Sequence, residues 1–173
     1  MRKELPVRKH PRLKEFDYSQ NGYYYVTICT QNNLPILSHV IVGRGLAPAD
    51  APTVEIELTV TGKIVEEQLL DLPNRFPCVN IDNYVIMPTH THIIIIISGK
   101  AAGASPRPTL MDVVRVFKSM STRLCNQNEN ILGRKIWQSS FYDKIIGNEE
   151  AYWSIWHYIN ENPDRWNEDE YYK

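Results

Sequence analysis

The sequence has no long hydrophobic segment and few cysteines, and each shortage excludes a class of protein. The longest purely apolar run is the five isoleucines at 93–97, whereas a membrane-spanning helix needs about 20 apolar residues. The three cysteines, Cys29, Cys78 and Cys125, are odd in number and form no C-x-x-C pair. That pattern is typical of a reduced chain with small buried thiols. The N-terminus carries charge without the apolar core of a secretory signal. We therefore expect a cytoplasmic protein with no membrane partner.

The sequence also lacks a large excess of positive or negative charge, but the charged residues are unevenly distributed along it. The net charge is −1, from 19 basic and 20 acidic residues. Residues 1–14 carry a local charge of +5, from six basic residues and one acidic residue. Residues 100–135 also carry +5, from seven basic residues and two acidic residues. Residues 148–173 carry −5. Attraction of phosphate depends on the local field, so two basic segments can hold a nucleic-acid strand, although solvated surface charge would look the same.

Length and composition indicate an ordinary folded domain. A chain of 173 residues with 43% hydrophobic and 23% charged residues can bury a full core without disulfides. We expect a single domain over residues 1–173, with a basic N-terminal arm at 1–20 and a flexible loop at 98–109.

Periodicity and turn residues predict the order of the elements. Strands are expected at 22–30, 80–87 and 90–98 and within 136–146. One helix is expected at 59–72, a second begins after an N-cap at Thr109, and a third covers 149–162 and ends before Pro163. Residues 42–52, rich in Gly, Pro and Ala, favour a loop. The order predicts an α+β, ferredoxin-like (split βαβ) fold with an antiparallel sheet, helices on one face, and an appended C-terminal helix.

Two histidines at the start of one strand are the first candidate site. His90 and His92 are two residues apart, so on an extended strand both imidazoles lie on one face and can converge on one ion. An isolated pair of this kind can equally form only local hydrogen bonds. With no cysteine or third histidine close in sequence, an open metal site with water or substrate ligands is favoured over a closed zinc site.

The last predicted helix carries the second candidate site. Tyr158 and Asn162 are four residues apart and therefore share a helix face. A phenol with a pKa of about 10 is a poor nucleophile at neutral pH, but a divalent cation beside it can polarise a phosphodiester. The Asn162 carboxamide can supply the third metal ligand beside the two histidines. Mg²⁺ suits oxygen-rich coordination, and two imidazoles shift the preference toward Mn²⁺.

At these residues the sequence resembles the REP-associated tyrosine transposases, a branch of the single-tyrosine HUH single-strand DNA transposases. The motifs occur in the family's order over about residues 9–166: YYYVTICT at 23–30, PTHTHII at 88–94, FKSMST at 117–122, WQ at 137–138, FYDKII at 141–146, NEE at 148–150 and YINENP at 158–163. One departure is Thr91 between the histidines, where the family usually has a bulky hydrophobic residue.

The resemblance implies a domain that binds and cleaves single-stranded DNA near hairpins. His90 and His92 would be the metal ligands, Asn162 would complete the metal shell, and Tyr158 would attack the scissile phosphate. The product would be a 5′-phosphotyrosine link with a free 3′-hydroxyl. Basic residues of the arm and of the second helix would contact phosphates: Arg8, Lys9, Arg12, Lys14, Arg115, Lys118 and Arg123.

Several alternatives remain open at this stage. Tyr142 is a rival nucleophile, and Tyr158 is favoured because Asn162 lies at helical spacing from it and because the motif of the resembled family places the nucleophile at this position. A hairpin-binding relative that has lost its chemistry would share the fold. So would an RNA-recognition domain, although its K/R-G-F/Y-G/A-F-V-x-F/Y signature is absent. The sequence leaves monomer and homodimer undecided.

Overall fold

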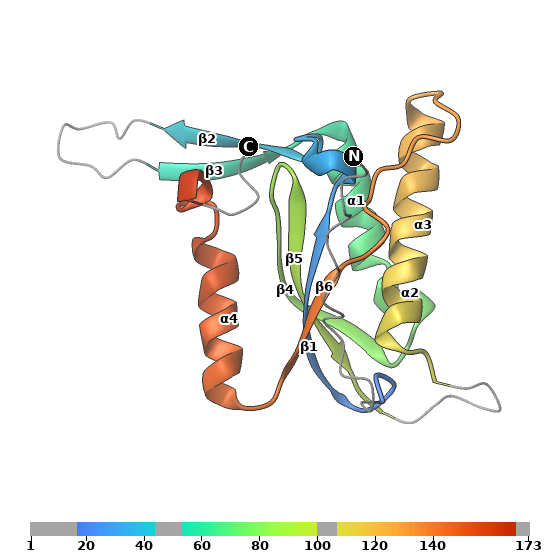
Figure 1. The fold of residues 1–173 in the computed structure, drawn as a ribbon, viewed down its shortest axis with the longest axis vertical. Helices are drawn as coiled ribbons and strands as arrows, with labels where there is room; N and C mark the ends of the chain where they lie inside the picture. The colour runs from blue at the N-terminus through green and yellow to red at the C-terminus, as the bar shows by residue number, and fades with distance from the viewer. Residues whose placement is uncertain (1–16, 44–52, 100–106, 169–173) are drawn as a thin grey trace, which may run out of the picture.

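The computed structural model describes residues 17–43, 53–99 and 107–168. Its central element is a four-stranded antiparallel sheet (Figure 1). The strand order β4-β5-β1-β6 is that of the split βαβ arrangement, so the predicted ferredoxin-like α+β fold is confirmed. The strands are β1 (Gly22–Cys29), β4 (Val79–Ile86), β5 (His90–Ile97) and β6 (Tyr142–Ile146).

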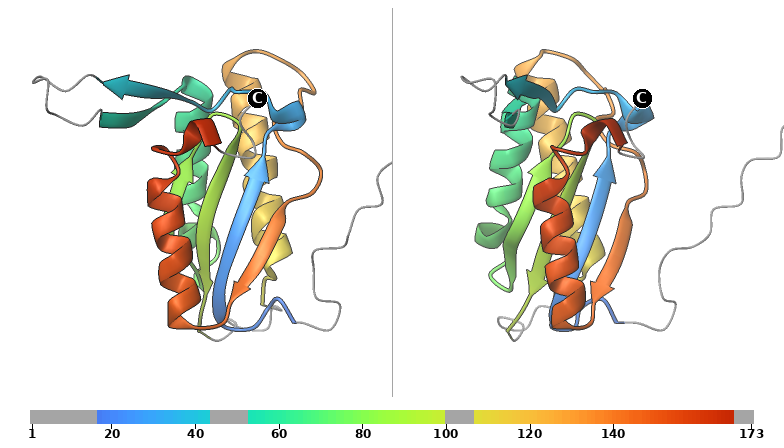
Figure 2. Two further views of the ribbon diagram at one scale, coloured as in Figure 1. Left: turned by 60° about the vertical axis from the view of Figure 1, so that its left-hand side comes forward. Right: turned by 90° about the vertical axis from the view of Figure 1, so that its left-hand side faces the viewer.

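Helices cover both faces of the sheet. Figures 1 and 2 show α1 and α3 on one face and α4 alone on the other. The sequence predicted helices on one face and an appended C-terminal helix, and the structure places that appended helix on the other face of the sheet. The helices are α1 (Val60–Leu70), α2 (Leu72–Arg75), α3 (Leu110–Asn128) and α4 (Glu149–Glu161), with short 3₁₀ turns at η1 (Gln31–Asn33) and η2 (Trp166–Glu168).

The alternation of β5 side chains divides the interior into two apolar layers. Ile93, Ile95 and Ile97 belong to the larger core under α1 and α3, whereas Ile94 packs into the smaller core under α4. A strand buried on both faces explains why the sequence has five consecutive isoleucines. Because side chains two residues apart share a face, His90 and His92 lie on the α4 side with Ile94.

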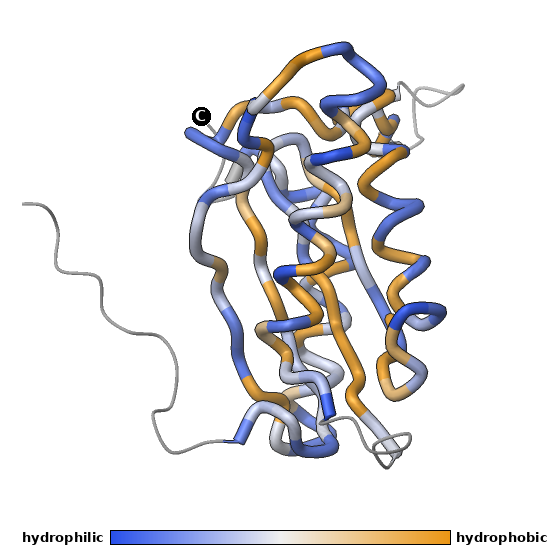
Figure 3. The backbone as a smooth tube through the Cα atoms, turned by 90° about the vertical axis from the view of Figure 1, so that its right-hand side faces the viewer, coloured by the Kyte–Doolittle hydropathy of each residue, from blue (hydrophilic) through white to orange (hydrophobic). Residues whose placement is uncertain are grey.

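Helix α3 begins as the sequence predicted. Thr109 is its N-cap, and reciprocal hydrogen bonds between Thr109 and Asp112 form a complete capping box. The buried residues Leu110, Val113 and Phe117 recur at helical spacing and face the sheet. Figure 3 views the molecule from the side of α1 and α3, and hydrophobic and hydrophilic residues alternate along its helical turns.

Two expectations about the first half of the chain are wrong in detail. A hairpin, β2 (Ser38–Gly43) and β3 (Thr53–Leu58), was not predicted, and Val42 belongs to β2 rather than to a loop. The Gly/Pro-rich composition of 42–52 obscured the alternating T-V-E-I-E-L pattern of β3. The helix expected at 59–72 ends at Leu70, and α2 follows after Asp71. Pro73 lacks an amide hydrogen and cannot extend a continuous helix.

Parts of three predicted segments lie outside the described residues: 1–16 of the basic arm, 44–52 of the loop expected at 42–52, and 100–106 of the loop expected at 98–109. Within the described ranges, no helix is both long enough and apolar enough to cross a membrane.

Candidate active site

The two strand histidines converge at the end of β5 that lies under the C-terminal part of α4. Their Nε2 atoms are 3.0 Å apart, and the ring centroids are 4.4 Å apart. Both side chains are buried, since neither residue is more than 1% exposed. The period-two geometry of the strand therefore brings two imidazole nitrogens to one point, as predicted.

A pair of hydroxyls on β1 orients His92. Its Nδ1 lies 2.8 Å from Tyr25 Oη and 2.9 Å from Thr27 Oγ1, and the Thr27 hydroxyl donates to Tyr25 Oη at 3.2 Å. Burial, followed by the nearby His90, lowers the pKa of His92 well below its usual value. The ring is therefore neutral near pH 7. A neutral ring that donates from Nδ1 to these oxygens has its lone pair at Nε2, which faces His90.

Tyr158 reaches the same point from α4. Its Oη lies 3.5 Å from His92 Nε2, and the two rings are 5.2 Å apart. Ile155 and Ile159 are buried against the sheet and fix this face of the helix. Tyr158 itself is 41% exposed. A phenol that contacts a buried histidine and is also open to solvent is accessible to a large substrate.

The end of α4 closes one side of the histidine pair. Asn162 is the C-cap of the helix, one turn beyond Tyr158, and only 3% of its surface is exposed. Four residues further on, the Trp166 ring lies 6.0 Å from the His90 ring. The C-terminal part of α4 and the turn after it therefore lie over both histidines.

The rival tyrosine lies on the same face of the sheet. Tyr142 of β6 is opposite Thr27 in the register, and Thr27 is opposite His92, so the three residues form one row across the sheet. The Tyr142 and Tyr25 rings are 6.2 Å apart, and Tyr142 is exposed. Proximity to the histidines does not by itself separate Tyr142 from Tyr158.

Thr91 points away from this site into the larger core. It is fully buried, and among the described residues its Oγ1 has no hydrogen-bond partner. Its strand neighbours in the register are Ile28 and Ile86, which are also buried. The position is apolar in its surroundings, as expected where the resembled family has a hydrophobic residue.

The basic residues of α3 are on the opposite face of the sheet from the histidines. Arg115 pairs with Asp112 at 2.7 Å and is mostly exposed. Lys118 donates to the backbone carbonyls of Gln138, Ser139 and Ser140, and the Arg123 guanidinium lies near a methionine sulfur. The structure does not bring these cations to the histidine pair. The predicted phosphate contacts of the arm, Arg8, Lys9, Arg12 and Lys14, lie outside the described residues.

The spacing of the two Nε2 atoms fits a shared metal ion. Two nitrogens that each bind an ion at about 2.1 Å are about 3.0 Å apart at the adjacent corners of an octahedron, and about 3.4 Å apart in a tetrahedron. The observed 3.0 Å matches the octahedral edge. In the described part of the chain, no third His, Cys, Asp or Glu joins the pair in a metal-ligating cluster.

Sequence reasoning missed Tyr25 and Thr27 as site residues. They lie within the Y-Y-Y-V-T-I-C-T strand, at the same period-two spacing as the histidines. The signal was the alternation of polar side chains on a strand that pairs with β5. Pairing and register, however, are properties of the folded sheet, and the sequence alone does not place Thr27 opposite His92.

Comparisons with known proteins agree with the fold. No family model matches the chain. A protein of Haemophilus influenzae, described only as uncharacterised, is 31% identical over 180 residues, which cover 95% of this chain and 93% of that protein. The solved structure of a REP-associated tyrosine transposase bound to a REP hairpin matches with a TM-score of 0.60 and 18% identity, over 89% of this chain and 73% of that chain. The chain therefore belongs to the same family as the Haemophilus protein and has the fold of a REP-associated tyrosine transposase.

Proposed function

We propose that this protein is a metal-dependent DNA transposase that cleaves and rejoins single-stranded DNA at hairpins through a covalent 5′-phosphotyrosine. The observation that carries the proposal is the convergence of His90 Nε2, His92 Nε2 and Tyr158 Oη. One structural neighbour is a REP-associated tyrosine transposase bound to a REP hairpin, and a DNA hairpin is the partner that we propose for this chain.

His90, His92 and the Asn162 carboxamide would hold Mg²⁺ or Mn²⁺. The ion, when bound, polarises the scissile phosphate and stabilises the charge that develops on its oxygens. Two imidazole nitrogens and one amide oxygen would leave coordination positions for phosphate and water oxygens. By accepting hydrogen bonds from His92 Nδ1, the hydroxyls of Tyr25 and Thr27 would leave the Nε2 lone pair of His92 available to the ion.

Tyr158 would act as the nucleophile in an in-line displacement at phosphorus. The bond from Tyr158 Oη to phosphorus forms while the bond from phosphorus to the 3′ oxygen breaks. The phenol gives up its proton, and the departing 3′ oxygen takes one up. Attack by another 3′-hydroxyl on the phosphotyrosine reverses the step and joins two strands. The exposed position of Tyr158 allows a DNA strand to reach it.

Basic side chains would position the DNA rather than read its sequence. The arm residues Arg8, Lys9, Arg12 and Lys14 and the α3 residues Arg115, Lys118 and Arg123 are proposed to contact phosphates. The α3 residues lie across the sheet from Tyr158, so they would contact a part of the hairpin that is distant from the cleaved bond. Removing three of the arm's cations should flatten the slope of log affinity against log salt by about two to three units.

A gel assay for the covalent adduct tests this function. Labelled hairpin oligonucleotides with single-stranded flanks, taken from the DNA around the gene, are incubated with Mn²⁺ or Mg²⁺ or with a chelator. The wild-type chain should give a metal-dependent shifted band that survives denaturation. Tyr158→Phe and the double variant His90→Gln/His92→Gln should lose the band, and Tyr142→Phe should keep it.

Two outcomes would contradict the proposal in different ways. Loss of the band in Tyr142→Phe with retention in Tyr158→Phe would assign the nucleophile to β6. Hairpin binding without any adduct, in either metal, would leave a DNA-binding protein without strand-cleaving chemistry.

A further inference from the structure

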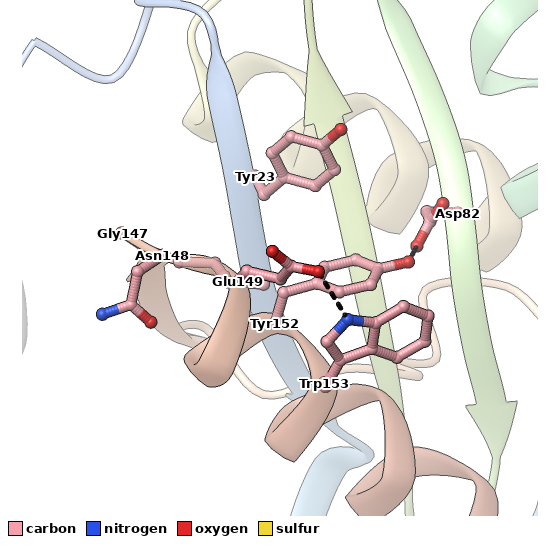
Figure 4. Close-up of a pocket in the computed structure, with 8 residues that line it drawn as sticks. Tyr23, Asp82, Gly147, Asn148, Glu149, Tyr152 and Trp153 are labelled. Carbon is pink, nitrogen blue, oxygen red and sulfur yellow. Dashed lines mark hydrogen bonds between the residues drawn. The ribbon is translucent and has the colours of Figure 1, made fainter.

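A second concave site lies at the other end of α4. A cavity of about 510 Å³ is formed where the first turn of α4 meets β1 and the bulged part of β4 (Figure 4). Its volume falls within the range of about 300–1,000 Å³ that is usual for small-molecule sites. On β1 the cavity is lined by Tyr23, four residues before Thr27 of the histidine site. It is therefore a separate site on the same face of the sheet.

Aromatic rings form the walls of this cavity. Tyr23 and Tyr152 are in edge-to-face contact at 5.7 Å, and Tyr152 contacts Trp153 in the same way at 5.1 Å. Tyr23 is 43% exposed and Trp153 is 47% exposed, and neither belongs to the apolar core under α4. Figure 4 shows the Tyr152 ring between Tyr23 and Trp153, and each of these two exposed rings can stack on a planar ligand.

A β-bulge brings a carboxylate to the cavity. The register between β4 and β5 shifts between Ile81 and Asn83, so Asp82 has no partner in the ladder. As a result, consecutive side chains reach α4: Asp82 accepts a hydrogen bond from Tyr152 Oη at 2.7 Å, and Asn83 donates to the Trp156 carbonyl. The bond to Asp82, the largest cause, raises the pKa of Tyr152 to about 12, so the phenol remains a donor.

A second carboxylate lies on the opposite wall. Glu149 accepts from Trp153 Nε1 at 3.3 Å through one of its two oxygens, as Figure 4 shows. The described residues that line the cavity include Asp82 and Glu149 but no lysine or arginine. Such a lining repels a phosphate group and accepts hydrogen bonds from a neutral donor.

We propose that this cavity binds one unpaired nucleobase that carries an exocyclic amino group. Exposed aromatic rings suit a planar base, and carboxylate acceptors suit the amino groups of adenine, cytosine or guanine better than the thymine O4 acceptor. The proposal rests on the function proposed above, since it makes the base part of the single-stranded DNA that the protein would cleave. The cavity then contributes base specificity, which contacts to phosphates lack.

The position of the cavity suits this role. Four residues of β1 separate Tyr23 from Thr27, which corresponds to about 13 Å along an extended strand. That length spans no more than about four stacked nucleotides at 3.4 Å each. The base that enters the cavity therefore lies in the single-stranded flank, within a few nucleotides of the bond that Tyr158 would attack.

Affinities for hairpins with homopolymeric flanks test the proposal. One DNA hairpin carries single-stranded flanks of only dA, only dC or only dT, so any register places the same base in the cavity. Fluorescence anisotropy should show that the wild-type chain binds dA and dC flanks more tightly than dT flanks. Trp153→Ala should weaken binding to dA and dC flanks by about 5- to 150-fold, which is the usual loss when one base-stacking ring is removed. Trp153→Phe should recover most of the lost affinity. Asp82→Asn should reduce the difference in affinity between hairpins with dC flanks and hairpins with dT flanks.

The control variant is Leu132→Ala, a fully exposed apolar residue beyond α3, which should bind like the wild type. Unchanged affinity of Trp153→Ala for all three flanks, with the covalent adduct still formed, would overturn the base-binding cavity and leave the proposed function standing. If the wild-type chain binds none of the hairpins, the proposed function and the cavity's role both fail.

Discussion

Replacing Thr91 by valine should stabilise the protein. The side chain is completely buried on the core side of β5, and within residues 17–43, 53–99 and 107–168 its hydroxyl has no hydrogen-bond partner. Burying an unsatisfied hydroxyl costs about 1–3 kcal/mol. Valine has the same shape, suits a strand and exchanges that hydroxyl for a methyl group among the buried Ile28 and Ile86. The free energy of unfolding should therefore rise by about 1–3 kcal/mol.

Urea and thermal unfolding, followed by far-UV circular dichroism, measure this change. For a chain of this length, each kcal/mol shifts the Tm by about 2–4 °C, so Thr91→Val should melt about 2 to 12 °C higher. Thr91→Ser is the matched control, because it keeps the hydroxyl and removes the methyl group, and should lose about 1 kcal/mol. If Thr91→Val is less stable than the wild type, the hydroxyl has a hydrogen-bond partner and the reasoning is refuted.

Three further predictions concern α1, α3 and the metal site. Gly62→Ala should lower the free energy of unfolding by about 1–3 kcal/mol or more, because an added Cβ would overlap the Leu37 carbonyl oxygen, and urea titrations measure this loss. Hydrogen bonds from the N-cap of α3 lower the pKa of Asp112 below 3.8, so its charge stabilises the fold above that pH and the benefit is lost as the pH falls below it. The stability difference between the wild type and Asp112→Asn should therefore shrink below pH 3.8, and a difference that grows there would contradict this sign. Thr27→Val should weaken Mn²⁺ binding about 10- to 100-fold in calorimetric titrations, because the lost hydroxyl no longer orients His92. If Thr27→Val binds Mn²⁺ as tightly as the wild type, the Tyr25 hydroxyl alone is enough to orient His92.

The fold was largely predictable because its patterns are local. The run of isoleucines at 93–97 indicated a strand, which the structure buries on both faces, and Thr109 indicated where α3 begins. The β2–β3 hairpin escaped because glycine and proline between its strands dominated the interpretation of the segment, although the alternation of Val54, Glu55 and Ile56 was present.

The candidate site was predictable only in part. The spacing of His90 and His92 predicted a shared face, and their Nε2 atoms do converge. The contact between Tyr158 and His92 depends on how α4 packs across the sheet, and the roles of Tyr25 and Thr27 depend on strand register. These are long-range features that no local pattern in the sequence specifies. The bulge at Asp82 is of the same kind, since the unpaired residue is recognisable only beside its partner strand.

The central claim is that Tyr158 forms the covalent bond to DNA, and peptide mass spectrometry of the trapped adduct tests it most directly. Trypsin separates the two rival tyrosines, because cleavage after Lys135, Lys144 and Arg165 places Tyr142 in residues 136–144 and Tyr158 in residues 145–165. After nuclease digestion of the bound DNA, the nucleotide mass should appear on residues 145–165, with fragment ions that assign it to Tyr158 rather than Tyr152. A nucleotide mass on residues 136–144, or on Tyr152, would contradict the account.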